Sequence, residues 1–154
     1  MDERFLITGN SLMDLITDHN EIADEVIGLS VLLEYGTYEF GTLLLKRASK
    51  SQNADEIHKI IEVGVELMNA ISHMDKLTLN MAILEPMLNV GVYKKINFVQ
   101  SSYIFTAREH NLILICNEKE IQDAAKEVGI PVLFTGNRDF EKKFTQFVEN
   151  RTRI

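Results

Sequence analysis

The sequence predicts an α/β fold of three layers, in which helices cover both faces of a central parallel sheet of about four to five strands. Short continuous apolar blocks recur along the chain, and segments with helical spacing of their apolar residues join them. Only two prolines occur, and no repeat, low-complexity stretch or linker interrupts the 154 residues. A chain of this length can bury a sizeable core, so we expect one domain over residues 1–154.

Helical spacing dominates the first half of the chain. Its predicted elements are a strand at Arg4–Ile7, a short helix at Ser11–Asp18, a second strand at Glu25–Leu29, a long helix after Ser30 to about Ala48, and helices at Ala54 to about Ile71 and about Leu77–Leu88. Asn10 or Ser11 is the expected N-cap of the short helix, and Ser30 that of the long one. Asn89-Val-Gly91 is expected to close the last helix.

The second half alternates helices with apolar blocks. Its predicted elements are a helix at Asn97–His110, a strand at Leu112–Cys116, a helix at Glu118–Val128, a strand at Ile130–Phe134 and a C-terminal helix at Asp139–Val148. Gly129 lies directly after the second of these helices, where a left-handed residue closes the last turn. This alternation is typical of parallel strands connected by helices.

Parallel sheets of this kind carry their functional groups at the carboxyl ends of the strands. The predicted ends are Thr8–Asn10, Ser30 with its helix, Asn117–Glu118 and Thr135–Asn137. We therefore expect the functional residues to come from these turns and from the helices that begin there.

Composition excludes several classes of protein. The 16 Lys and Arg residues against 23 Asp and Glu residues give a formal charge of −7, which argues against broad, charge-driven binding of nucleic acid. No apolar run is long enough to cross a bilayer and the N-terminus MDERFLI is not a secretory signal, so a cytoplasmic location is expected. Cys116 stands alone in an apolar strand, which predicts a buried structural thiol.

Four stretches of the sequence carry a resemblance to a known family. They are LITGNSLMDLI, LSVLLEYGTYEFGTLLLKR, FVQSSYIFTAREHNLILI and LILICNEKEIQDAAKEVGIPVL. In this order they resemble the PIN-domain family, and most closely its small members, the toxin-type ribonucleases of toxin–antitoxin pairs. The resemblance runs from Arg4 to about Phe134 and rests on pattern more than on invariant residues.

The resemblance implies a site built on four acidic positions, of which this chain keeps two. The first position falls on Thr8, the second on Glu39, the third on Gln100 and the fourth on Glu118. Both replacements are neutral. Glu39 and Glu118 are therefore the candidate catalytic residues, and also the candidate metal ligands, with binding expected to be weak or absent.

The first acidic position allows more than one register. A slide of one or two residues would place Gly9 or Asn10 there, and neither is acidic. The Asn that follows the first acid in the family is present as Asn10, and Thr42 matches the position three residues after the second acid. We expect Thr8, Asn10, Thr42 and Gln100 to line the cleft.

PIN nucleases are understood to hold one or two Mg²⁺ or Mn²⁺ ions against the scissile phosphate through these acids. Two carboxylates with some amide or hydroxyl oxygens could still bind one ion weakly. Other acids that could substitute are Asp14, Glu34, Glu120 and Asp123, but none occupies a strand end as the missing first acid should. Glu39 could instead lie on a solvated stripe of its helix, and Glu118 could be a plain first-turn acid.

Three functions follow from the resemblance. The chain could be a Mg- or Mn-dependent endoribonuclease that uses Glu39 and Glu118, a non-catalytic module that binds RNA or protein, or a toxin relative held by an antitoxin-like protein partner. We expect lost or weakened catalysis, and the acidic balance weakens the RNA-binding alternative. Tyr35, Tyr38, Phe40 and Tyr93 belong either to the core or to a dimer face, and the resemblance implies a homodimer.

Overall fold

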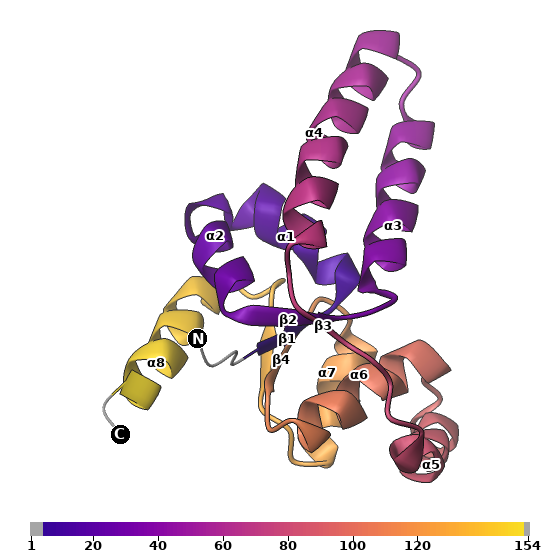
Figure 1. Cartoon of the computed structure of the whole chain (residues 1–154), viewed down its shortest axis with the longest axis vertical. Helices are drawn as coiled ribbons and strands as arrows, with labels where there is room; N and C mark the ends of the chain where they lie inside the picture. Colours follow the sequence, from indigo (N-terminus) through magenta and orange to yellow (C-terminus); the bar gives the residue numbers. More distant parts are fainter. Residues whose placement is uncertain (1–4, 153–154) are drawn as a thin grey trace.

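A computed structural model describes residues 5–152, which form a five-stranded parallel sheet with helices on both faces (Figure 1). Its elements are β1 (Phe5–Ile7), α1 (Gly9–Asp18), α2 (Asn20–Gly28), β2 (Ser30–Leu33), α3 (Gly36–Lys50), α4 (Ala54–Ser72), β3 (Lys76–Leu77), the 3₁₀ turn η1 (Met81–Ile83), α5 (Leu84–Lys94), α6 (Phe98–Glu109), β4 (Ile113–Cys116), α7 (Lys119–Glu127), β5 (Val132–Phe134) and α8 (Phe140–Thr152). The predicted three-layer α/β/α fold is confirmed. Arg4, the expected start of the first strand, lies outside the described residues.

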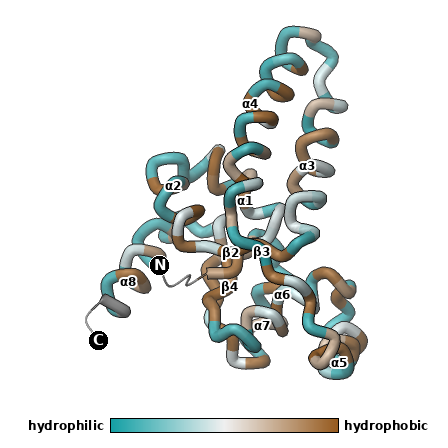
Figure 2. The backbone as a smooth tube through the Cα atoms, viewed as in Figure 1, coloured by the Kyte–Doolittle hydropathy of each residue, from teal (hydrophilic) through white to brown (hydrophobic). Residues whose placement is uncertain are grey.

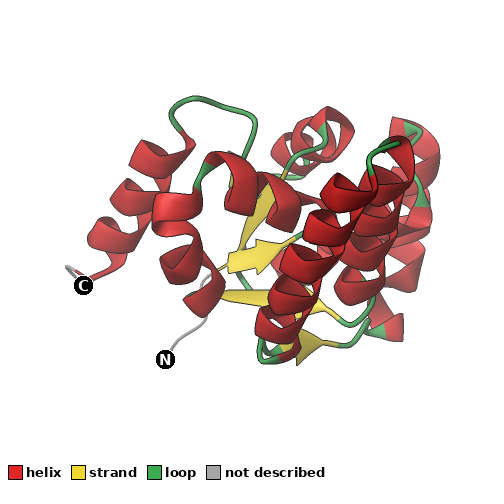
Figure 3. Ribbon diagram, turned by 90° about the horizontal axis from the view of Figure 1, so that it is seen from above, coloured by secondary structure: helices red, strands yellow, loops and turns green. Residues whose placement is uncertain are grey.

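The strand order is β3-β2-β1-β4-β5, with β1 in the centre and every pair parallel. Ile7 of β1 lies opposite Leu32 on one side and Ile115 on the other. The strands run in the same direction, toward the side of the molecule where α3 and α4 stand (Figure 3). The carboxyl ends of β1, β2 and β4 therefore meet at one edge of the sheet.

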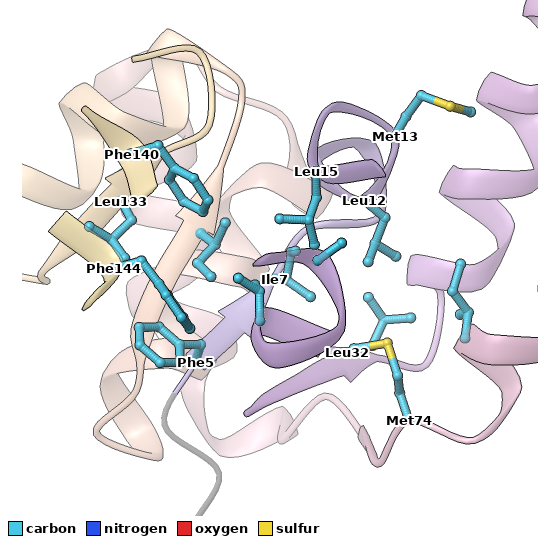
Figure 4. Packing of buried hydrophobic residues seen from close by; sticks show 14 of the residues in the cluster. Phe5, Ile7, Leu12, Met13, Leu15, Leu32, Met74, Leu133, Phe140 and Phe144 are labelled. Carbon is cyan, nitrogen blue, oxygen red and sulfur yellow. The ribbon is translucent and has the colours of Figure 1, made fainter. Parts of the chain in front are cut away.

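Successive residues of β1 face opposite layers, as strand geometry requires. Phe5 and Ile7 pack with α1, α2, α3, α4 and α8, whereas Leu6 packs with α5, α6 and α7. In the first layer, the rings of Phe140 and Phe144 bring α8 against the sheet, and the Phe144 ring centroid lies 4.9 Å from that of Phe5 (Figure 4).

The α3 and α4 helices form an antiparallel hairpin that extends beyond the rest of the molecule (Figure 1). Asn53 caps α4 by accepting hydrogen bonds from the Asp55 and Glu56 amides, and the helix begins at Ala54, as predicted. Gly64 of α4 lies against α3, because an added Cβ there would come within 2.3 Å of a Leu44 methyl group. A glycine at this position lets the two helices pack tightly.

The second strand and its flanking helices differ from the prediction. Glu25–Leu29 was expected to be a strand, but most of it belongs to α2, and the strand is Ser30–Leu33. Ser30 caps no helix: its hydroxyl donates to the Val26 carbonyl, 2.6 Å away. The apolar residues of α2 recur at helical spacing and pack against the sheet. The strand is formed instead by the buried residues that begin at Ser30. Ser30 thus lies at the amino end of β2, away from the predicted functional edge.

The structure also corrects the prediction at both ends of one helix. The predicted helix at Leu77–Leu88 is a two-residue edge strand, a 3₁₀ turn capped by Asn80, and the start of α5. Asn89-Val-Gly91 does not close that helix, which continues to Lys94 and ends where Lys95 adopts a left-handed φ of 54°. In contrast, Gly129 has the expected left-handed conformation after α7, with φ of 79°.

Cys116 is fully buried in β4, as predicted.

Among the described residues, no helix combines the length and apolar character needed to span a membrane.

Candidate functional site

A cleft of about 570 Å³ opens at the carboxyl edge of the sheet, where the prediction placed the functional residues. It lies between the first turns of α1 and α3, the start of α6 and the loop after β4. Its lining residues are Asn10, Tyr35, Tyr38, Glu39, Thr42, Leu43, Lys46, Val99, Asn117 and Glu118. Of the predicted site residues, Glu39, Glu118, Asn10 and Thr42 are thus brought together.

Thr8 does not line this cleft, contrary to the prediction. It is buried as the N-cap of α1, a role that the sequence analysis assigned to Asn10 or Ser11. Its hydroxyl accepts a hydrogen bond from the Ser11 amide at 3.2 Å and lies 2.6 Å from the Ser11 hydroxyl. The cap requires a residue just before the first helical turn, and Thr8 occupies that place directly after β1.

Gly9 allows α1 and α3 to begin in contact. A Cβ at this position would come within 2.3 Å of the Gly36 carbonyl oxygen and 2.8 Å of the Glu39 Cβ. The Gly9 amide donates to the Tyr103 hydroxyl at 3.2 Å. The absence of a side chain at Gly9 therefore brings Glu39 of α3 close to the start of α1.

Glu39 is bound to the buried Tyr103 of α6, whose hydroxyl donates to the Glu39 carboxylate. Burial raises the pKa of Glu39, and the charge of Glu118 adds to this, whereas the Tyr103 hydrogen bond and the Gly9 amide oppose it. Burial and the charge of Glu39 raise the pKa of Tyr103 far above its ordinary value. Tyr103 therefore remains a protonated donor.

Tyr35 is an aromatic residue that lines the cleft. Burial raises its pKa above the ordinary value, with further contributions from the charges of Glu39 and Glu34. Its hydroxyl pairs with that of Ser102, and its ring meets the Tyr103 ring edge-on at a centroid distance of 5.8 Å. Tyr35 and Tyr103 thus both link α6 to the start of α3.

Glu118 is held by two neutral amides. Asn10 Nδ2 donates to Glu118 Oε1 at 3.2 Å, and Gln100 Nε2 donates to Glu118 Oε2 at 2.6 Å. Gln100 Oε1 accepts from the Asn97 amide at 2.9 Å, which completes the capping box of α6. Gln100 is not among the residues that line the cleft, contrary to the prediction. Its side chain connects the α6 cap to Glu118.

Asn117 adds a further polar contact at the end of β4. Its Nδ2 donates to the Asn10 carbonyl at 3.3 Å, and its Oδ1 is buried with no hydrogen-bond partner within the described residues. Asn117 therefore reinforces the contact between the β4 end and α1.

These residues do not fit a Mg²⁺ or Mn²⁺ site. Glu39 and Glu118 are the only acids that line the cleft, and Lys46 adds a positive charge to it. Within residues 5–152, no three His, Cys, Asp or Glu side chains are grouped to hold a metal ion. Both oxygens of Glu118 are already hydrogen-bonded to amides, so the hard oxygen ligands that such ions need are too few.

The other acids that the sequence offered as candidates do not line the cleft. Asp14 accepts a hydrogen bond from the Thr135 hydroxyl at 3.2 Å, and Thr135 belongs to the turn after β5. Glu34, Glu120 and Asp123 are exposed and do not line the cleft. Glu39 and Glu118 therefore remain the only acidic side chains among the residues that line the cleft.

Tyr103 and Lys46 were not among the predicted site residues, whereas Asn117 lies at one of the strand ends where functional residues were expected. Tyr103 carried a usable signal, because it lies three residues after Gln100 and thus one helical turn from a predicted site position. Lys46 lies one turn beyond Thr42 on α3 and could have been found in the same way.

No family model and no curated protein matches this sequence. Among solved structures, the chain is similar to the crystal structure of PAE2754 from Pyrobaculum aerophilum, with a TM-score of 0.68 and 21% sequence identity. The similarity covers 86% of this chain and 92% of that one. At this identity it shows the shared fold alone.

Substitution of Gly9 by Ala is expected to destabilise the protein. The new methyl group meets the Gly36 backbone oxygen, so urea denaturation should show a loss of about 1–3 kcal/mol or more in the free energy of unfolding. Gly28→Ala is the matched control, because a Cβ there meets nothing within 4 Å. Equal stability of the two variants would contradict the close approach of α1 and α3.

The stability of the protein should decrease as pH rises through the raised pKa of Glu39. Between the ordinary pKa of 4.5 and the raised pKa, the folded state binds more protons than the unfolded state. The free energy of unfolding therefore decreases as pH rises across this window. Glu39→Gln should flatten this part of the pH profile of unfolding free energy, measured by urea denaturation. The exposed Glu34→Gln is the control, and unchanged slopes in both variants would refute the assignment.

Proposed function

We propose that this chain is a cytoplasmic PIN-like domain that has lost metal-dependent ribonuclease chemistry and acts as a non-catalytic module that binds a protein. The observation that carries the proposal is the occupation of both Glu118 oxygens by the amides of Asn10 and Gln100. The resemblance of the sequence to small PIN ribonucleases supplies the starting point, and the fold is compatible with it.

The contact between Gln100 and Glu118 supports the loss of the metal. Two carboxylates at this separation would repel each other unless a cation lay between them. Gln100 places a neutral N–H donor there instead, at 2.6 Å, so Glu118 is satisfied without a cation. An ion that entered this cleft would have to break these hydrogen bonds for a small electrostatic gain.

Glu39 supports the same conclusion. Metal ligands must be deprotonated, and burial makes Glu39 hold its proton more tightly than a free glutamate. Its carboxylate also already accepts the hydrogen bond of Tyr103. Of the two candidate catalytic residues, neither offers a free carboxylate.

The cleft favours a protein partner over RNA. RNA backbones are held mainly through contacts from Lys and Arg to phosphate, and Lys46 is the only such residue among those that line the cleft. The two glutamates beside it repel phosphate. The resemblance to toxin–antitoxin ribonucleases suggests a small antitoxin-like protein as the partner.

A homodimer is the second part of the proposal. Exposed apolar side chains gather on α5, where Val92 is 76% and Tyr93 81% accessible and Leu88 is also exposed. Figure 2 shows hydrophobic residues along this helix. Symmetric dimers bury apolar surface of this kind against a second copy.

Calorimetric titration of Mn²⁺ tests the loss of the metal site. Wild-type protein should show no saturable binding at millimolar Mn²⁺. Gln100→Glu preserves a capping-box residue but places a second carboxylate beside Glu118, so this variant should gain Mn²⁺ binding and a Mn²⁺-dependent rise in melting temperature.

Gln146→Glu, at an exposed position of α8, is the matched control and should gain neither. Saturable wild-type binding in the micromolar range that Glu39→Ala or Glu118→Ala abolishes would overturn the proposal.

Sedimentation equilibrium tests the dimer. Wild-type protein should sediment as a dimer and Tyr93→Glu as a monomer, because a charge would be buried at the interface. Leu45→Glu, at an exposed position of the α3–α4 hairpin, should remain dimeric. A monomeric wild-type protein would remove this part of the proposal.

A further inference from the structure

His19 is the joint between α1 and α2, and its side chain is buried. The other histidines, His58, His73 and His110, are exposed. The backbone N–H of His19 ends α1 by donating to the Leu15 carbonyl at 3.1 Å, and its carbonyl accepts from the Ile22 amide at 3.2 Å. The imidazole ring is therefore held at a fixed joint of the fold.

Both ring nitrogens of His19 face hydrogen-bond acceptors. Nε2 lies 2.8 Å from the carbonyl oxygen of Thr135, which directly follows β5, and Nδ1 lies 3.2 Å from Oε1 of Glu141, in the first turn of α8. A carbonyl oxygen and an ionised carboxylate can only accept. With Glu141 ionised, both contacts are satisfied only when each ring nitrogen carries a hydrogen, which is the imidazolium form.

Glu141 is the charged side chain in direct contact with this ring. Asp14 of α1 is one contact away, because its carboxylate accepts from the hydroxyl of Thr135, whose carbonyl accepts from His19. The exposed charged side chains of α2, of the α1 end and of the start of α8 are Asp18, Glu21, Asp24, Glu25, Arg138, Asp139, Lys142 and Lys143. Within residues 5–152 no Lys or Arg forms an ion pair with Glu141, so His19 provides its counter-charge.

The His19 ring also packs against the first residue of α8. Its centroid lies 4.8 Å from that of the buried Phe140 ring. Phe140 and Phe144 belong to the same apolar cluster as Leu133 and Phe5 of the sheet (Figure 4). His19 therefore joins three parts of the chain that are far apart in the sequence: the α1–α2 joint, the turn after β5 and the start of α8.

Loss of the ring proton removes one of the two polar contacts. A neutral imidazole carries hydrogen on one nitrogen only, so it presents a lone pair either to Glu141 or to the Thr135 carbonyl. Thr135 is buried, and its amide is bonded to the Cys116 carbonyl of β4. The Glu141 side chain is 42% accessible and can turn into water. The contact with Glu141 is therefore the one that breaks.

We propose that His19 and Glu141 form a proton-dependent latch that holds the amino end of α8 against the α1–α2 joint. The docked helix binds more protons than the released one, so the latch is closed at low pH and opens as pH rises through the titration of the ring. A histidine side chain ordinarily changes its charge between about pH 5 and 8. Neither residue lines the cleft, and the latch does not depend on the proposed function.

Nuclear magnetic resonance of the full chain tests the latch. The ring nitrogen shifts of His19 should show both nitrogens protonated at about pH 5.5 and only Nε2 protonated at about pH 8. Hydrogen-exchange protection of the α8 amides, taken relative to that of the α6 amides in the opposite layer, should fall at least about tenfold between these pH values. The physical reason is the loss of a charge-assisted hydrogen bond.

Matched variants separate the latch from other titrating groups. The amide of Glu141→Gln can accept from Nδ1 or donate to it, so α8 should stay docked at both pH values and the fall should disappear. Glu21→Gln removes the same charge at an exposed position two residues from His19 and should keep the fall. His19→Gln retains a donor for the Thr135 carbonyl and should also abolish the fall, whereas the exposed His58→Gln should not.

A His19 ring that keeps one protonation state from about pH 5.5 to 8 would overturn the latch. Relative protection of α8 that does not change with pH would do the same. So would a wild-type fall in Glu141→Gln or His19→Gln, or its loss in Glu21→Gln or His58→Gln. None of these measurements involves Mn²⁺ or the cleft.

Discussion

The contact between the first turns of α1 and α3 is the constraint on which the candidate site depends. The parallel strands β1 and β2 deliver these turns to the same edge of the sheet, and Gly9 lets them touch. Tyr103 reaches the junction from the opposite layer, accepts the Gly9 amide and donates to Glu39. One glycine thus sets the positions of groups from both layers of helices.

Two neutral side chains near the carboxyl edge of the sheet, those of Thr8 and Gln100, both take part in helix caps. Thr8 caps α1, and Gln100 completes the capping box of α6. Each satisfies backbone amides that would otherwise lack partners at a helix start. Gln100 in addition donates a hydrogen bond directly to Glu118. The two side chains therefore add local order to the helix starts around the cleft.

The sequence predicted what depends on long periodic segments and missed what depends on tertiary contact. The α4 and α6 helices and the β4 strand were anticipated because their apolar residues repeat over many positions or form an isolated block. The second strand was predicted too early in the sequence. Only Leu29 separates α2 from β2, so the apolar residues at the end of the helix and those of the strand are not separated by a polar segment. A two-residue edge strand such as β3 leaves no pattern to find. In the site, Glu39 and Glu118 were predicted through a family resemblance and both line the cleft, whereas the Tyr103–Glu39 contact joins residues 64 positions apart.

The burial of Cys116 has a practical consequence for spectroscopy. It is the sole cysteine of the chain, and burial raises its pKa to about 12, so the folded protein presents almost no reactive thiolate. A cysteine introduced at the tip of the α3–α4 hairpin would therefore accept a single fluorescent dye without removal of the native thiol. The local motion of the hairpin tip then becomes accessible to fluorescence anisotropy measurements of that single dye.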